Sequence, residues 1–441
     1  MQHRVMMGRN LVVSNLVDPM SPTETVPHTA IAVSRRRVWL VRMALLGVML
    51  VLSVKIGDVL LGISLNTRER HELRLAPNTS WRHRSDEFDY EFRTNSLGFR
   101  GPEIPFDRTT AGVRRFLVVG DSFVAGHGVG EDDLFTAQWQ RRLDESRGEG
   151  PPSEVINLGR TGTSTLGELR LYWAIGRKFR PDVVVLCLYL GNDLAEIVQE
   201  QTLGESAEWT PTGFVRNAAY HVAPNAYLEL SMRRRAAESA RQTGQRSDDQ
   251  ILTDVLDAAR ARGIDESTAR ERFQALPEDT LRSAREGLFS PHRLVQACAD
   301  PDRTARSLDP DDAFFERAWP RMEYALGRLA VSAENEGAKF LLVVIPSPLQ
   351  VSAEAQAFDR RLGFDVKGEW LTESCRTQRA VEAWAAANMV PILDLTPTLR
   401  QAAEPCYYVR DGHFNPAGHG VAARTVADFV AGAASVGRRD D

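Results

Sequence analysis

Five short, continuously apolar runs constrain the fold of this chain more than any other feature of its sequence. They read RFLVVG at 115–120, SEVINLG at 153–159, DVVVLCLYLG at 182–191, KFLLVVIP at 339–346 and VPILDL at 390–395. Strands that are apolar on both faces are typical of a parallel sheet that is covered by helices on both sides. Amphipathic stretches with helical periodicity separate the runs, at 134–143, 166–178, 315–336 and 377–388. This alternation predicts an α/β fold with a doubly wound, mostly parallel five-stranded sheet between helices.

The alternation is interrupted once, at residues 198–312. This stretch is charged, rich in Arg, Ala and Glu, and mostly helical in pattern. Because it falls between the third and fourth predicted strands, we interpret it as a helical insertion. It divides the α/β domain into a first part, residues 113–197, and a second part, residues 313–434.

A long apolar stretch precedes the α/β domain. Residues 38–65 read VWLVRMALLGVMLVLSVKIGDVLLGISL, which is apolar except at Arg42, Lys55 and Asp58. A helix of about 20 mostly apolar residues is long enough to cross the hydrocarbon core of a bilayer. We therefore predict a transmembrane anchor at residues 38–61; a buried or interfacial helix is the alternative. No small-residue cleavage signal clearly follows, which favours an uncleaved signal anchor over a removed signal peptide.

The flanks of this stretch predict its orientation. Three arginines, at 35–37, come directly before it, and positive residues favour the cytoplasmic side. We therefore expect a cytoplasmic N-terminus and an exported C-terminal part, periplasmic or extracellular. Residues 1–37 show no sustained periodicity and are predicted to be a disordered tail, and residues 435–441 form a second short tail. Residues 62–112 are interpreted as a juxtamembrane arm, in which Phe88, Tyr90 and Phe92 alternate with acidic residues and predict a strand.

Charge and cysteine spacing exclude two classes of function. The formal net charge of −5 provides no overall basic field, so no nucleic-acid partner is expected. The four cysteines have no C-x-x-C spacing, so no zinc site is expected. Cys187 lies in an apolar run and is interpreted as a buried thiol. An exported domain would permit one disulfide among the other three, and the sequence does not choose the pair.

Polar residues cluster just beyond several of the predicted strands. In open α/β sheets, ligands bind outside the carboxyl ends of the strands, so these residues are the candidates for chemistry. Along the chain they are Gly120-Asp121-Ser122-Phe123, then Asn157 with a turn containing Gly159 and Gly162, then Gly191-Asn192-Asp193, and finally Asp411-Gly412-His413. Because these groups meet at one edge of the sheet, we expect a site there.

The residue types fit acyl transfer. A serine hydroxyl becomes nucleophilic when an imidazole takes its proton, and an acidic partner holds the imidazole tautomer. We predict that Ser122 is the nucleophile, His413 the base and Asp411 its partner. The oxyanion would be held by the side chain of Asn192 and by the amides of Gly162 and Ser122. The alternatives are that Ser122 and Asn192 only cap helices and that Asp411 only forms a turn.

These blocks resemble those of the SGNH/GDSL-like hydrolase superfamily, including its membrane-anchored bacterial members. The nucleophile block corresponds to residues 120–123, the two oxyanion blocks to Gly162 and Asn192, and the last block to Asp411 and His413. The resemblance covers residues 115–197 and 315–430, and it implies an SGNH/flavodoxin-like fold with no metal and no organic cofactor.

One spacing departs from the usual family pattern. Asp411 precedes His413 by two residues, whereas three is common in the family, and the shorter spacing resembles that of SGNH-like polysaccharide O-acetyltransferases. The distance from His413 to Asn415 and on to His419 matches the usual pattern, so His413 is a better candidate for the base than His419.

The predicted function is that of an SGNH serine esterase. It would hydrolyse short-chain or acetyl esters through an acyl-enzyme on Ser122, and its substrate would be an acylated glycan or lipid of the cell envelope. The first alternative is an O-acetyltransferase that acts on an envelope polysaccharide. The second is a catalytically silent envelope scaffold that keeps only the fold.

Overall fold

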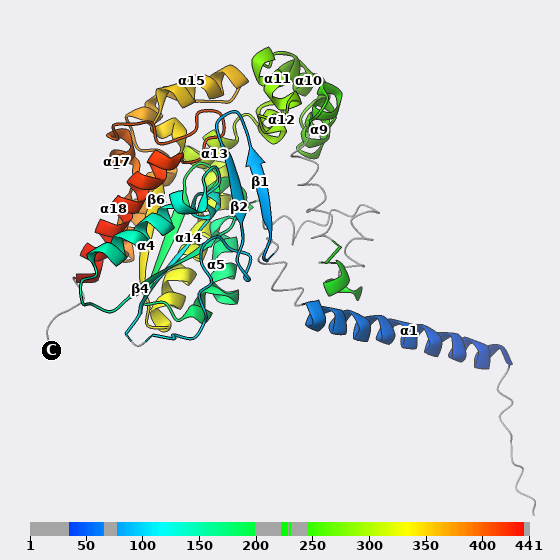
Figure 1. The fold of residues 1–441 in the computed structure, drawn as a ribbon. Helices are drawn as coiled ribbons and strands as arrows, with labels where there is room; N and C mark the ends of the chain where they lie inside the picture. Colours follow the sequence, from blue (N-terminus) through cyan, green and yellow to red (C-terminus); the bar gives the residue numbers. More distant parts are fainter. Residues whose placement is uncertain are drawn as a thin grey trace, which may run out of the picture. The chain divides into compact units, whose positions relative to one another are not determined.

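Five parallel strands form one sheet in the computed structural model, which describes residues 35–65, 77–110, 112–198, 222–227, 229–230 and 245–435. The strand order is β4-β3-β5-β6-β7. The predicted α/β class and all five predicted strands are confirmed (Figure 1). In chain order the strands are β3 (Arg114–Gly120), β4 (Ser153–Gly159), β5 (Val183–Tyr189), β6 (Lys339–Ile345) and β7 (Ile392–Asp394).

Helices cover both faces of this sheet. On β3, Phe116 and Val118 pack into one apolar cluster together with α4 and α18. Leu117 and Val119 point to the opposite face and pack with α5, α14 and α16. Every residue of the central strands therefore meets a helix, which explains why their sequences are apolar without alternation. The covering helices are α4 (Phe135–Ser146), α5 (Thr165–Ala174), α14 (Asp312–Asn335), α16 (Arg376–Ala387) and α18 (Pro416–Ser435).

The described part of the predicted insertion is helical. Helix α9 (Asp248–Ala261) begins at a capping box in which the Ser247 hydroxyl accepts from the backbone N–H of Gln250, whose side chain bonds back to the Ser247 N–H. Residues of α9 to α12 share an apolar cluster, to which Phe358 and Leu362 of α15 (Ala353–Leu362) also belong. Residues of α13 pack instead into a cluster of the sheet domain. The helices are α9 (Asp248–Ala261), α10 (Glu266–Gln274), α11 (Glu278–Arg285), α12 (Pro291–Ala299) and α13 (Arg303–Leu308).

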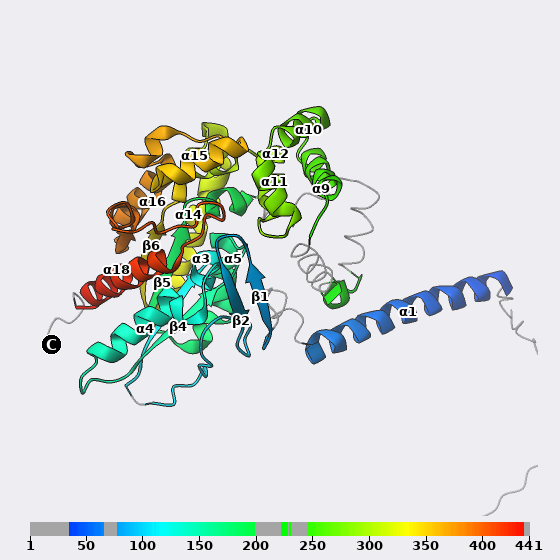
Figure 2. The ribbon, with the colours of Figure 1, turned by 45° about the horizontal axis from the view of Figure 1, so that its top comes forward.

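The arm that precedes the sheet contains an antiparallel hairpin, β1 (Ser80–Arg84) and β2 (Asp89–Arg93). The strand predicted from alternating aromatic residues is β2, and its Tyr90 and Phe92 side chains are buried. The tip of the hairpin lies beside α11 and α12 (Figure 2), where the backbone N–H of Asp86 donates to the Leu288 carbonyl. The hairpin therefore contacts the insertion.

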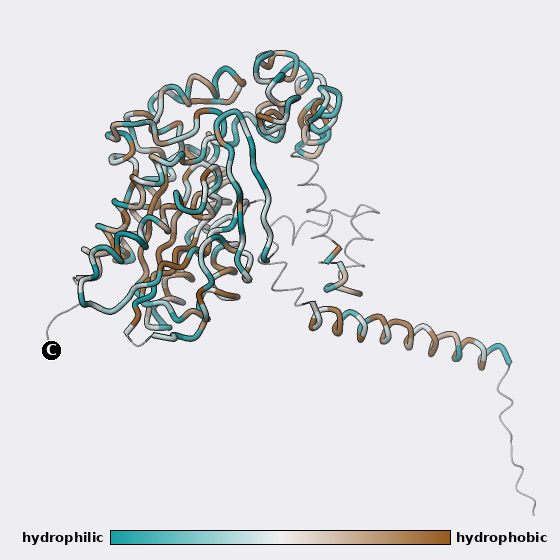
Figure 3. The backbone as a smooth tube through the Cα atoms, viewed as in Figure 1, coloured by the Kyte–Doolittle hydropathy of each residue, from teal (hydrophilic) through white to brown (hydrophobic). Residues whose placement is uncertain are grey.

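One helix among the described residues is long and apolar enough to cross a membrane. It is α1 (Arg35–Leu65), whose segment Val38–Ser64 has a mean hydropathy of 2.2 (Figure 3). Almost none of this segment is buried. Twenty-seven helical residues extend about 40 Å, which exceeds the hydrocarbon thickness of a bilayer. This helix agrees with a single-pass anchor or a signal sequence. Residues 1–34 and 436–441, and with them almost all of both predicted tails, lie outside the described residues.

The cysteines form no disulfide. Cys187, Cys298, Cys375 and Cys406 are all described, buried and unpaired. Burial raises the pKa of each of these thiols, so all four stay protonated at neutral pH. The disulfide that an exported domain would permit is absent from these four positions.

Candidate active site

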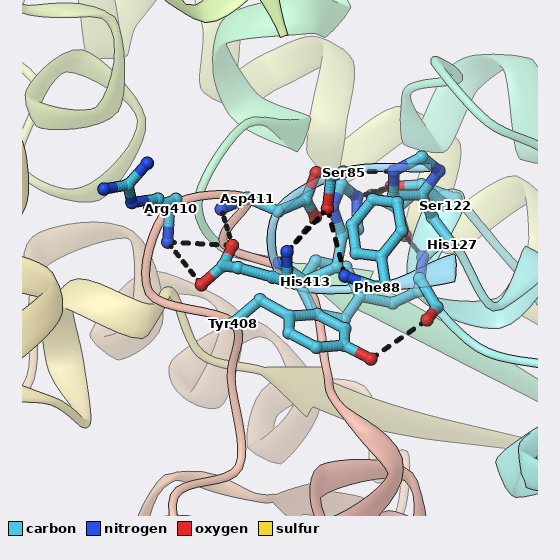
Figure 4. Close-up of polar contacts among 12 residues, drawn as sticks. Ser85, Phe88, Ser122, His127, Tyr408, Arg410, Asp411 and His413 are labelled. Atoms are coloured by element: carbon cyan, nitrogen blue, oxygen red, sulfur yellow. Dashed lines mark hydrogen bonds and ion pairs between the residues drawn. The ribbon is translucent and has the colours of Figure 1, made fainter. Parts of the chain in front are cut away.

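The nucleophile candidate, Ser122, is the first residue of the short helix α3 (Ser122–Ala125), which directly follows β3. Asp121 caps this helix: its carboxylate accepts from the backbone N–H of Phe123 at 2.9 Å. The capping role therefore belongs to Asp121 and leaves the Ser122 hydroxyl available. Ser122 Oγ lies 2.7 Å from His413 Nε2 (Figure 4).

Two glycines let α3 sit close to the sheet. Gly126 ends the helix with a φ of +72°, and a Cβ there would lie 1.9 Å from Leu134 Cδ2. Gly159 ends β4, where a Cβ would lie 2.1 Å from the backbone nitrogen of Ala125. A side chain at position 159 would push α3 away from the strand ends, and Ser122 with it, whereas one at position 126 would be strained and would displace the Leu134 side chain.

Two side chains hold the carbonyl end of α3. Asn157 Nδ2 donates to the Val124 carbonyl at 2.7 Å, and the Arg100 guanidinium donates to the Gly126 carbonyl at 2.6 Å. Asn157 was expected just beyond its strand but lies inside β4, so its function is to anchor the helix. Arg100 is buried against Phe92, and burial lowers the pKa of its guanidinium. The nucleophile helix is thereby fixed at both ends.

The Asp-Gly-His segment sits in a tight loop between Tyr407 and Phe414, which form an antiparallel bridge. Gly412 has a φ of +89°, a conformation that glycine adopts without strain. This turn brings the side chains on either side of Gly412 together, with Asp411 Oδ1 2.6 Å from His413 Nδ1. The left-handed glycine therefore explains how residues two positions apart bring a carboxylate and an imidazole into hydrogen-bond contact.

The electrostatics suit a charged Asp411 partner. Burial by itself raises the pKa of Asp411, but the adjacent His413 and His127 rings outweigh it, so the pKa lies well below its usual value. The carboxylate stays ionised and accepts from His413 Nδ1–H, which leaves Nε2 free to accept the Ser122 proton. By contrast, burial raises the pKa of the capping Asp121 to about 7.

The fold and this geometry agree with a family comparison. A family model described as "SGNH hydrolase-like domain, acetyltransferase AlgX" matches residues 311–440, which include Asp411 and His413. The match assigns the second part of the domain to the SGNH/GDSL-like hydrolases. A domain of this kind acts on esters, as a hydrolase or an acyltransferase.

Several solved structures are similar to this SGNH chain. A psychrotrophic esterase EstA from Pseudoalteromonas sp. is 10% identical, with a TM-score of 0.34, over 73% of this chain and 99% of that one. A lipase/acylhydrolase from Enterococcus faecalis is 13% identical, with a TM-score of 0.33, over 73% and 96%. The acetylxylan esterase Axe2 from Geobacillus stearothermophilus, solved as a catalytic mutant, is 11% identical, with a TM-score of 0.33, over 74% and 96%. No curated protein sequence matches the chain.

The two other oxyanion candidates of this SGNH site lie beyond the carboxyl ends of neighbouring strands. Gly162 is in the turn after β4, with a φ of +67°. Asn192 follows β5, and its Nδ2 donates to Glu196 Oε1 at 3.0 Å while its Oδ1 has no hydrogen-bond partner. Glu196 in turn pairs with Arg303 of the insertion helix α13. The roles of Gly162 and Asn192 in binding an oxyanion remain predictions.

The sequence did not reveal one residue of the site, His127. No motif marks His127 in the sequence, yet its Nε2 lies 3.4 Å from Asp411 Oδ2. Its ring centroid is 4.6 Å from that of His413. His127 directly follows Gly126 at the end of the nucleophile helix. Its closeness to Ser122 in the sequence could have marked it as a candidate residue of the site.

Among the described residues, one group of side chains could hold a metal ion: His127, Asp411 and His413, whose ligand atoms lie within 4.8 Å of one another. These atoms already bond to one another and to Ser122. We therefore assign them to hydrogen bonding and proton transfer. His419, the other candidate base, is buried and accepts from the backbone N–H of Phe135 through Nδ1. Burial lowers the pKa of His419 to about 3, as expected of a neutral structural histidine.

Proposed function

We propose that this chain hydrolyses short-chain esters, in particular acetyl esters, through an acyl-enzyme on Ser122. The observation that carries the proposal is the hydrogen-bonded series from Ser122 to His413 to Asp411, at 2.7 and 2.6 Å. A serine aligned in this way with an oriented imidazole is poised to attack a carbonyl.

The chemistry follows from this alignment. His413 Nε2 takes the Ser122 proton as Oγ bonds to the acyl carbon, and the resulting imidazolium is stabilised by Asp411. The backbone N–H of Ser122, with Gly162 and Asn192, would donate to the oxyanion. His413 then gives its proton to the departing alcohol, which leaves the acyl group on Ser122. A water molecule, deprotonated by His413, releases the acid in the second half of the cycle.

O-acetyl transfer is the second candidate, and one observation favours it. The family model that matches the second part of the domain is that of an acetyltransferase. In this reaction the first half is unchanged, and the hydroxyl of an envelope polysaccharide replaces water in the second half. Both candidates use the same acyl-enzyme, so the acceptor alone distinguishes them.

The experiment that tests both candidates uses the full chain in detergent with 4-nitrophenyl acetate. We expect nitrophenol release, acetylation of a protein fragment containing Ser122, and labelling by a serine-reactive fluorophosphonate. Addition of an acetyl-acceptor polysaccharide separates the candidates: transfer places acetyl groups on the glycan, whereas hydrolysis yields acetate alone. A chain that neither takes the fluorophosphonate nor releases nitrophenol would instead be the silent scaffold.

The proposed location follows from α1 and the arginines before it. The helix would anchor the chain once, with a cytoplasmic N-terminus and the SGNH domain exported. We expect an alkaline phosphatase fused to the C-terminal residue to be active, because this reporter folds only in an exported compartment. Changing all three arginines at 35–37 to glutamate should lower this activity. Recovery of the native chain entirely in the soluble cytosolic fraction would contradict the anchor.

A further inference from the structure

The β1–β2 hairpin of the arm packs directly against the catalytic residues. Its aromatic side chains form a continuous cluster with the site, in which the Phe88 ring lies 5.4 Å from that of His127 and 5.3 Å from that of Tyr408. The His83 ring stacks on that of Tyr90 at 5.4 Å. A segment that only tethered the enzyme would have no need of these contacts.

The hairpin is connected to the Asp411 side chain by polar contacts through His127. Tyr90 Oη lies 3.3 Å from His127 Nδ1, and His127 Nε2 lies 3.4 Å from Asp411 Oδ2. If the tyrosine hydroxyl donates to Nδ1, the imidazole carries its proton on Nε2, which faces the carboxylate. The two oxygens of Asp411 are then shared between two histidines: Oδ1 faces His413 and Oδ2 faces His127.

A second route holds the backbone of the catalytic loop. Glu87, in the turn of the hairpin, accepts from the backbone N–H of Asp411 at 2.8 Å and from that of Arg410 at 3.0 Å. Asp86 forms an ion pair with the Arg410 side chain. Burial raises the pKa of Glu87, although these two backbone donors oppose the change. The turn of the hairpin therefore holds in place, by hydrogen bonds and an ion pair, the loop that carries Asp411 and His413.

We propose that the β1–β2 hairpin is a positioning element of the active site, which orients Asp411 through His127 and Glu87. The inference rests on the proposed Ser122 chemistry and deepens it: the polar series would extend from Ser122 through His413, Asp411 and His127 to Tyr90. His127 is a positioning residue: its backbone N–H donates to the Ser122 carbonyl, and its ring contacts Asp411 and Tyr90 rather than the reacting Oγ. The juxtamembrane arm would then belong to the catalytic unit.

The inference predicts a pH effect with a definite sign. His127 donates to Asp411, so it draws part of the carboxylate charge away from His413. Its removal should leave more negative charge facing the imidazolium form of His413, which moves the acidic limb of the kcat/KM profile to higher pH. The other titratable or charged groups that face this pair come from β1, β2, their turn, α12 and the catalytic loop: His83, Tyr90, Glu87, Arg293, Tyr408 and Arg410.

The test compares His127→Leu with His127→Gln in the full chain. His127→Leu removes the donor, and we expect kcat/KM for 4-nitrophenyl acetate to fall about 10- to 100-fold, the equivalent of one hydrogen bond to a charged group. KM should change little, and the acidic limb should move upward. His127→Gln keeps a donor and should restore most of the activity. Asp89→Asn is the matched control, because Asp89 pairs with Arg82 on the exposed face of the same hairpin.

Each result decides the question. Three outcomes would overturn the inference. The first is a His127→Leu variant whose kcat/KM falls by the same factor at every pH, and the second is one whose kcat/KM does not change. The third is a His127→Gln variant that is as inactive as His127→Leu. If His127→Leu unfolds below the assay temperature, Tyr90→Phe tests the same hydrogen-bonded series, because it deletes one hydroxyl. The acidic limb of its kcat/KM profile should move to higher pH by a smaller amount. An acidic limb that does not move in Tyr90→Phe would also refute the inference. If the wild-type chain shows no Ser122-dependent turnover, the proposed function fails instead.

Discussion

Replacing Ser122 by alanine should reduce hydrolysis of 4-nitrophenyl acetate by about 10⁴-fold or more. Alanine keeps α3 intact, because Asp121 rather than Ser122 caps it, but it removes the oxygen that we propose carries the acyl group. Steady-state nitrophenol release measures the loss, and the melting temperature should be unchanged within a few degrees. Ser146→Ala is a suitable control, since the Ser146 hydroxyl is exposed and bonds only to carbonyls of its own helix.

His413→Ala should cost about as much as the loss of Ser122, because nucleophile and base act as one unit. The double variant Ser122→Ala/His413→Ala should therefore lose almost nothing more than either single variant. Fluorophosphonate labelling that persists in Ser122→Ala would refute the nucleophile assignment. Activity that survives in His413→Ala and disappears in His419→Ala would show that the wrong histidine was chosen.

Asp411→Asn should lower kcat by about 10²- to 10⁴-fold, which is less than the loss from Ser122→Ala. The amide nitrogen of asparagine could face His413 Nδ1 at the position where Oδ1 now accepts. The imidazole would then carry its proton on Nε2 and could no longer accept one from Ser122. The fall should appear in kcat with KM nearly constant, because Asp411 touches no part of the substrate.

The pH profile of Asp411→Asn supplies an independent check. Without the carboxylate, protonated His413 loses its stabilising partner, so the acidic limb should move to lower pH, opposite to the shift expected for His127→Leu. Asp132→Asn is the matched control, because the Asp132 side chain is fully exposed. An asparagine variant with wild-type kcat would show that Asp411 forms a turn and has no part in catalysis.

The sheet and the chemical blocks could be predicted from the sequence because both are local patterns. A strand such as β5 is apolar at every position, and this pattern arises only when both faces are covered. The Asp-Gly-His segment brings the side chains of Asp411 and His413 together through one glycine turn, so this contact is local in the sequence. The strand β1 was not predicted, since in SWRHR the inward positions are Trp81 and His83, and histidine gives a weak apolar signal.

What could not be predicted depends on contacts between distant segments. Glu87 meets the backbone of Asp411 across 324 residues, and Tyr90 meets His127 across 37. No periodicity records such pairings, because they follow from where the hairpin docks and not from its own secondary structure. The burial of Arg100 also depends on distant contacts. From the sequence alone, its guanidinium would be expected on the surface. Long-range docking, not local propensity, therefore decided the residues that were missed.

Ser122 and His413 are 291 positions apart in the chain, so the ribosome makes the serine long before the histidine. A chain emerging from the ribosome presents β3, β4 and the nucleophile helix long before the loop at 407–414 has been made. Until that loop docks, the serine hydroxyl has no base and reacts with esters no faster than any alcohol. Parallel strands with long crossovers also pair slowly. Ester turnover would thus mark the last event of folding, and a chain interrupted before residue 407 would be inactive toward esters.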